Sequence, residues 1–172
     1  MQALVRQHGG RPVGSRGDSL LAEFPSVVEA VQCAVEMQRE LKLRNAGFPP
    51  DRQVEFRIGI NVGEIVVEGE QIHGGGINVA VRLEGLAQAG GICISEVVYD
   101  QIKSRLALAC EDLGEHALKN IAKPVRVYRI LMDEEEAFTG NRRAVPARRL
   151  YTIGKRQWRK THIPPAEPGV CL

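Results

Sequence analysis

An amide and a guanidinium lie four residues apart just after a run of three glycines: Asn78 and Arg82 follow Gly74, Gly75 and Gly76. The glycines lead into an apolar segment of good helix formers, which predicts a tight loop followed by a helix. Residues at i and i+4 share a helix face, so the two polar side chains are expected one turn apart. An amide beside a guanidinium fork suits a ligand that carries phosphate. Considered alone, the stretch is more simply an ordinary amphipathic helix with a solvated arginine.

Apolar periodicity predicts the elements that must position these residues. Ser26 and Glu29 form a capping box that opens a helix over residues 26–44, and Ser95 is expected to cap another helix over 95–104. In the helix after the glycines, the packing surface is expected from Ile77, Ala80, Val81 and Leu83. Strands are predicted over residues 11–15, 20–24, 54–62, 65–68, 92–94, 106–113 and 124–131.

The order of these elements indicates an α+β sheet with helices on one face. Residues 54–62 alternate apolar with polar side chains, so this strand is expected to bury one face and to form a hairpin with 65–68. After Met132 the sequence becomes acidic and then basic with little periodicity, which predicts a linker or disordered tail over 133–172. Residues 1–132 are expected to form one domain.

Composition narrows the function classes. Apolar residues make up 44% of the 172 residues, charged residues 26%, and the formal net charge is only +2, so nucleic-acid binding is not indicated. Four cysteines lack metal-ligand or disulfide spacing, and Cys33 and Cys93 fall in apolar patterns as small hydrophobes. No signal peptide or membrane-spanning segment is apparent, so we expect a soluble, cytoplasmic chain.

Short motifs in a fixed order carry a family resemblance. The sequence GDSLLAEF lies at 17–24, FRIGINVGE at 56–64, LKNI at 118–121 and PVRVY at 124–128, with the glycine stretch between the second and third. Each motif is weak, but the ordered set resembles the catalytic domain of class III adenylate and guanylate cyclases, of the bacterial adenylate cyclase type. The resemblance covers most of the chain and implies a ferredoxin-like core.

The resemblance also implies a reaction and the residues that perform it. In the family, the ribose 3′-oxygen of ATP or GTP attacks the α-phosphate and pyrophosphate leaves. By resemblance, Asp18 is a ligand of Mg²⁺ or Mn²⁺, Asn78 positions the ribose, and Arg82 stabilises the α-phosphate in the transition state. Without the resemblance, Asp18 would be read as a turn residue that binds its own backbone.

Phosphate and base recognition stay open by resemblance. A lysine before the last strand would hold the terminal phosphates, and both Lys119 and Lys123 fall in that loop, where either could equally be a solvated charge. The base-recognition positions correspond to Gly14, Gln71 and the adjacent Ile72. An amide both donates and accepts hydrogen bonds, so Gln71 suits either purine. ATP is favoured only because the subtype resembles adenylate cyclases.

One family feature has no counterpart in the sequence. In the family, a central strand with the first metal aspartate precedes the region that matches Met1, and its absence would leave unpaired strand edges. We therefore expect an N-terminally truncated fragment, although completion by another chain or a degenerate gene product are alternatives. The resemblance implies a homodimer or heterodimer in which Asp18 faces the Asn78 and Arg82 of a partner. The alternatives to a cyclase are a catalytically incomplete dimerisation or regulatory partner and a purely structural domain.

Overall fold

The computed structural model describes residues 1–16, 19–63, 66–68, 71–132 and 149–158. Its helices are α1 (Gln2–Gln7), α2 (Val27–Asn45), α3 (Gly75–Leu86) and α4 (Glu96–Ile102), with a 3₁₀ turn at Pro50–Arg52. Its strands are β1 (Arg11–Arg16), β2 (Ser19–Phe24), β3 (Val54–Ile60), β4 (Val66–Glu68), β5 (Gln71–His73), β6 (Ile92–Ser95), β7 (Cys110–His116), β8 (Val125–Ile130) and β9 (Arg149–Trp158).

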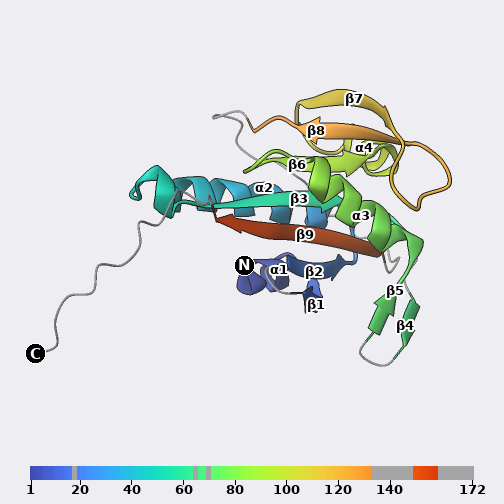
Figure 1. Ribbon diagram of the computed structural model, residues 1–172, viewed down its shortest axis with the longest axis horizontal. Helices are drawn as coiled ribbons and strands as arrows, with labels where there is room; N and C mark the ends of the chain where they lie inside the picture. Colours follow the sequence, from blue (N-terminus) through green and yellow to red (C-terminus); the bar gives the residue numbers. More distant parts are fainter. Residues whose placement is uncertain (17–18, 64–65, 69–70, 133–148, 159–172) are drawn as a thin grey trace, which may run out of the picture.

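A seven-stranded sheet organises the described residues, with the strand order β1-β2-β9-β3-β6-β8-β7 (Figure 1). Neighbouring strands are antiparallel except β3 and β6, which run parallel. This confirms the predicted α+β class, and the sheet is rich in antiparallel pairs. The hairpin predicted between 54–62 and 65–68 is wrong, because β4 pairs instead with β5 in a separate two-stranded sheet.

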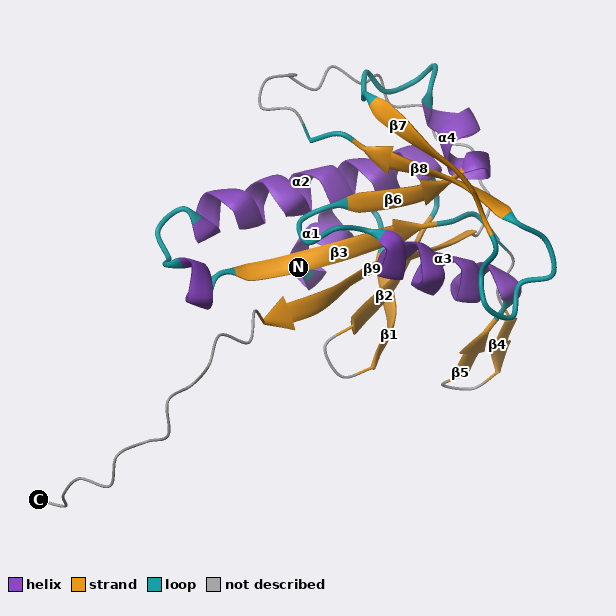
Figure 2. Cartoon of the chain, turned by 45° about the horizontal axis from the view of Figure 1, so that its top comes forward, coloured by secondary structure: helices purple, strands orange, loops and turns teal. Residues whose placement is uncertain are grey.

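Helices cover both faces of the sheet, so the prediction of helices on one face is wrong. On β6, Ile92 and Ile94 belong to the core cluster that contains α2 and α4, whereas Cys93 between them packs with Leu83 of α3. Successive residues of a strand point to opposite faces, so α3 lies on the face opposite α2. Figure 2 shows α2 and α3 on the two sides of β3.

Hydrogen bonds from two polar side chains fix α2 against the sheet. The Gln38 amide donates from Nε2 to the carbonyl oxygens of Phe56 (3.0 Å) and Gly91 (3.1 Å). At the end of the helix, Asn45 accepts from the Val54 N–H (3.0 Å) and donates to the Val54 carbonyl (2.9 Å). Such bonds satisfy buried backbone groups that would otherwise be costly. They tie α2 to the beginning of β3.

The predicted helix caps are only partly formed. Ser26 is the N-cap of α2, and its hydroxyl oxygen accepts from the Val28 N–H (3.2 Å). Glu29 does not complete the predicted capping box. Its carboxylate lies 3.3 Å from His8 Nδ1 instead. The Glu36 carboxylate lies 2.7 Å from His8 Nε2. These contacts hold the end of α1 against α2. Ser95 is the N-cap of α4 without a side-chain cap bond.

The prediction of a linker or disordered tail after Met132 is wrong for Arg149–Trp158. This segment is β9, and it pairs antiparallel with β2 on one side and β3 on the other. It therefore lies in the interior of the sheet, where the resemblance led us to expect an unfilled position. The sequence signal failed because backbone pairing with two neighbours, rather than apolar periodicity, defines this strand.

Buried thiols provide a test of the core. Burial raises the pKa of Cys33 to about 12 and that of Cys93 to about 11, so both stay protonated near neutral pH. We expect Ellman's reagent at pH 8 to modify these two thiols only as fast as the protein unfolds, because the thiolate is the nucleophile. Mass spectrometry of labelled peptides checks this. Rapid labelling of either cysteine in the native protein would contradict the core described above.

Candidate active site

The start of α3 is built by close backbone packing. Gly76 lies so near Gly63 that a Cβ on Gly63 would come within 2.5 Å of the Gly76 Cα. Nearby, the Asn61 amide donates to the Gly76 carbonyl oxygen (3.1 Å). Asn61 follows β3 directly and is buried. Gly76 is thus required for packing whether or not the glycine stretch also approaches a phosphate.

Asn78 and Arg82 are both exposed on α3, four residues apart as the sequence predicted. The opposite side of the helix is buried through Ala80 and Leu83. Val81, predicted as a packing residue, is instead 42% exposed and lies between the two polar positions. The amide, the guanidinium and an apolar side chain therefore share the outward surface of this helix.

The position of α3 depends on Gly59 in the middle of the sheet. A Cβ at Gly59 would lie closer than 3.0 Å to the Ala80 carbonyl oxygen and to backbone atoms of Glu84. The sequence placed Gly59 and Asn61 on a polar face of β3, yet both are buried because α3 covers that face. The sequence did not identify these two residues as positioning residues. Alternation of apolar and polar residues along β3 suggests one solvent-facing side and does not reveal that a helix packs on that side.

The candidate phosphate lysines lie in the loop between β7 and β8. Leu118 is buried and anchors this loop, whereas Lys119 and Lys123 are both exposed. Asn120 adopts a left-handed conformation (φ 65°) that turns the chain between them. In both views the loop lies at the same end of the sheet as the start of α3 (Figures 1 and 2). The geometry brings both lysines to this end without selecting one.

The remaining candidate residues are placed only in part. Gly14 lies in β1 opposite Leu21, at an irregularity in the β1–β2 pairing. Gln71 and Ile72 lie in β5, and His73 separates them from the glycines at the start of α3. Asp18 falls outside the described residues, in the β1–β2 connection. Among the residues that are described, no group of three or more His, Cys, Asp or Glu side chains could hold a metal ion.

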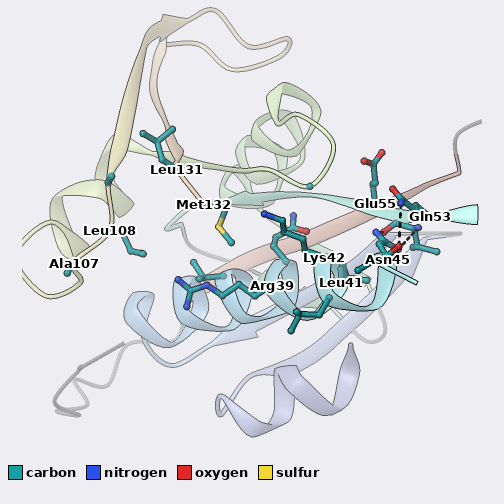
Figure 3. A pocket seen from close by; sticks show the side chains of 17 residues that line it. Arg39, Leu41, Lys42, Asn45, Gln53, Glu55, Ala107, Leu108, Leu131 and Met132 are labelled. Atoms are coloured by element: carbon teal, nitrogen blue, oxygen red, sulfur yellow. Dashed lines mark hydrogen bonds between the residues drawn. The ribbon is translucent and has the colours of Figure 1, made fainter. Parts of the chain in front are cut away.

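A groove of about 1230 Å³ lies away from these residues, between the second half of α2 and the segments 107–109 and 131–132 (Figure 3). Arg39 and Lys42 of α2 line one side, and Leu131 and Met132 line another. Asn78 and Arg82 do not line it. The candidate site is therefore an exposed helix face rather than this groove.

Comparison with known proteins shows the family of this fold and site. The family described as "Adenylate and Guanylate cyclase catalytic domain" matches residues 1–132. The chain belongs to this family. The protein named putative adenylate cyclase 3, from Rhizobium meliloti, is 39% identical to this chain over 128 residues. The aligned region covers 74% of this chain and 22% of that protein. The chain thus spans about a fifth of the length of this curated relative.

Solved structures agree with the family. The adenylate/guanylate cyclase/hydrolase from Silicibacter pomeroyi is 37% identical, with a TM-score of 0.72 and 76% of each chain covered. The adenylyl cyclase CyaB from P. aeruginosa is 25% identical, with a TM-score of 0.62 over 80% of this chain and 79% of that chain. Within the described residues, the cyclase domain has no helix long and apolar enough to cross a membrane.

Proposed function

We propose that this cyclase domain converts ATP, or GTP, to a 3′,5′-cyclic nucleotide and pyrophosphate. The observation that carries the proposal is the exposure of Asn78 and Arg82 on one face of α3 in a cyclase-family fold. The ribose 3′-oxygen forms a bond to the α-phosphorus, the bond from that phosphorus to the bridging oxygen breaks, and the hydroxyl proton is released. ATP is favoured because the curated relative is named an adenylate cyclase.

Each candidate side chain has a role that follows from its chemistry. The Asn78 amide would hold the ribose by donating and accepting hydrogen bonds. The Arg82 guanidinium would donate to the oxygens of the α-phosphate as negative charge develops there. Lys119 or Lys123 would bind the terminal phosphates. Gln71 and Ile72, with Gly14, are proposed to contact the base.

A second chain would complete the site. Asn78, Val81 and Arg82 form an exposed surface that includes one apolar side chain, Val81, and a single chain leaves it uncovered in the described residues. Burying an apolar side chain between subunits favours association. We propose a homodimer or heterodimer in which Asp18 of one chain faces Asn78 and Arg82 of the other.

The proposed cofactor is Mg²⁺ or Mn²⁺, held by oxygen ligands. Asp18 has suitable donor chemistry, but one carboxylate does not make a site for two ions, and the described residues add no ligand cluster. Asp18 itself lies outside the described residues, so no step of the reaction is derived through the metal. The second candidate function is a catalytically incomplete partner that relies on another cyclase chain for metal ligands.

Replacement of Asp18 tests the metal role. If the chain is active, Asp18→Asn is expected to lower metal-dependent product formation by about 100-fold or more, because a metal ligand supplies several kcal/mol of charge stabilisation. Activity would be measured with ATP and with GTP across a Mn²⁺ titration, and Asp51→Asn in the exposed 3₁₀ turn serves as the matched control. Equal activity and equal metal dependence in both variants would contradict the assignment.

A further inference from the structure

The strands β2 and β3 form a β-α-β unit with a strand position left between them. Both run antiparallel to β9, so they are parallel to each other, and α2 connects them. Ala22 and Phe24 of β2 share a core cluster with Ile58 and Ile60 of β3 and with buried residues of α2. Both walls of this position are therefore fixed to the same helix, independently of the strand between them.

The strand that fills the position comes from far along the chain. β8 ends at Ile130 and β9 begins at Arg149, three strand positions away in the sheet order. β9 pairs with β2 from Ser19 opposite Lys155 to Phe24 opposite Arg149. It pairs with β3 from Val54 opposite Trp158 to Gly59 opposite Thr152. Two backbone ladders thus attach it to the domain.

The sequence of β9 suits this interior position poorly. Both ladders are irregular at the same place, and Gly154 has a register partner on neither strand. In the register of the second ladder, Lys155 is paired with Arg57. Among the described residues, the buried Arg57 Nε has no hydrogen-bond partner. Leu150, Tyr151 and Ile153 lie in the first half of β9, whereas 154–157 reads Gly-Lys-Arg-Gln, so the apolar run typical of a fully buried strand is interrupted in the second half.

We infer that the space between β2 and β3 is a binding site for an extended peptide strand, and that β9 is its replaceable occupant, held there by its tether. Recognition would be by backbone hydrogen bonds on both edges, as in strand addition to a sheet. β9 also pairs with residues close to the candidate site: Ser19 follows Asp18 in the sequence, and Gly59 packs against α3, which carries Asn78 and Arg82. The link between β9 and the candidate site rests on the proposed function, whereas the strand-binding site itself does not.

Cleavage of the tether tests the inference. A protease site is placed within 137–144 of the full chain, and the cut protein is incubated with a fluorescent 149–158 peptide. We expect the cut protein to take up the peptide, and the uncut protein to take up about tenfold less or lower, because the tethered strand competes at millimolar effective concentration. The matched control peptide carries Thr152→Pro, which removes a ladder donor and is expected not to bind.

The same samples contain the results that would overturn the inference. Failure of the cut protein to bind the peptide while Cys33 and Cys93 stay protected would show that β9 does not exchange. Exposure of these two thiols on cutting would show that β9 is an obligatory part of the core. Neither readout depends on cyclase activity, so the proposed function stands or falls separately.

A disulfide cross-link between β2 and β9 tests whether β9 occupies this position in the uncut protein. In a background with Cys110→Ser and Cys171→Ser, the pair Leu21→Cys and Thr152→Cys is expected to form a disulfide within one chain, since these positions are directly paired. The pair Leu21→Cys and Ile153→Cys is the control, because adjacent strand positions point to opposite faces. Cross-linking of the control alone, or dimers linked between chains, would overturn the placement of β9 in its own chain.

Discussion

Arg82→Ala is expected to lower cyclic-nucleotide formation by about 10²–10³-fold, the usual cost of removing a group that stabilises transition-state charge. Arg82 is exposed on α3, so the substitution should leave the fold and the midpoint of thermal unfolding almost unchanged. The loss is expected in kcat rather than in KM, because the guanidinium acts mainly where charge develops. Product chromatography after incubation with ATP or GTP and Mn²⁺ measures the change.

The matched control is Arg52→Ala, which removes an exposed guanidinium from the 3₁₀ turn after α2. This variant should retain the parent's activity. A rise in KM alone for Arg82→Ala would mean that the side chain only binds substrate. Equal activity of both variants would remove Arg82 from the site.

Gly59→Ala is expected to destabilise the protein by about 3 kcal/mol, the upper part of the usual overpacking range, because the added methyl group meets backbone atoms of α3 that cannot rotate away. Relief requires α3 to move from the sheet, which would also displace Asn78 and Arg82. We therefore expect loss of activity in the protein that remains folded. Urea unfolding followed by circular dichroism gives the stability change.

Gly85→Ala is the matched control for this prediction. Gly85 lies in α3 with open space around its hypothetical Cβ, so alanine should stabilise the helix by about 0.5–1 kcal/mol. Opposite signs for the two substitutions are the expected result. A neutral Gly59→Ala would show that the close approach of β3 and α3 does not exist.

Local patterns predicted the parts of the fold whose signals are local. The helix from Val27 to Asn45 and the exposed pair Asn78 and Arg82 followed from spacing alone. β9 did not, because its place depends on the two edges that β2 and β3 leave open, and its second half is mostly polar. The pairing of segments so distant along the chain depends on the tertiary fold, so a short stretch of sequence does not reveal it.

The candidate site shows the same division. The residues expected to contact substrate have distinctive side chains and could be named from sequence. Asn61 and Gly59, which position their helix, looked like the polar half of an alternating strand. Val81 looked like a packing residue, because apolar character does not reveal that the helix turns this side outward. Knowledge of both sheet faces was needed to assign these three.

The most direct test of a composite cyclase site is to mix two inactive variants. Asp18→Asn and Arg82→Ala are each assayed alone with ATP, GTP and Mn²⁺, and then after co-refolding at equal concentration. If each site takes Asp18 from one chain and Arg82 from the other, random pairing should restore about a quarter of parental activity. An active parent whose mixed variants stay inactive would contradict the shared site, and no product from the parent with either nucleotide would contradict cyclase activity in this chain.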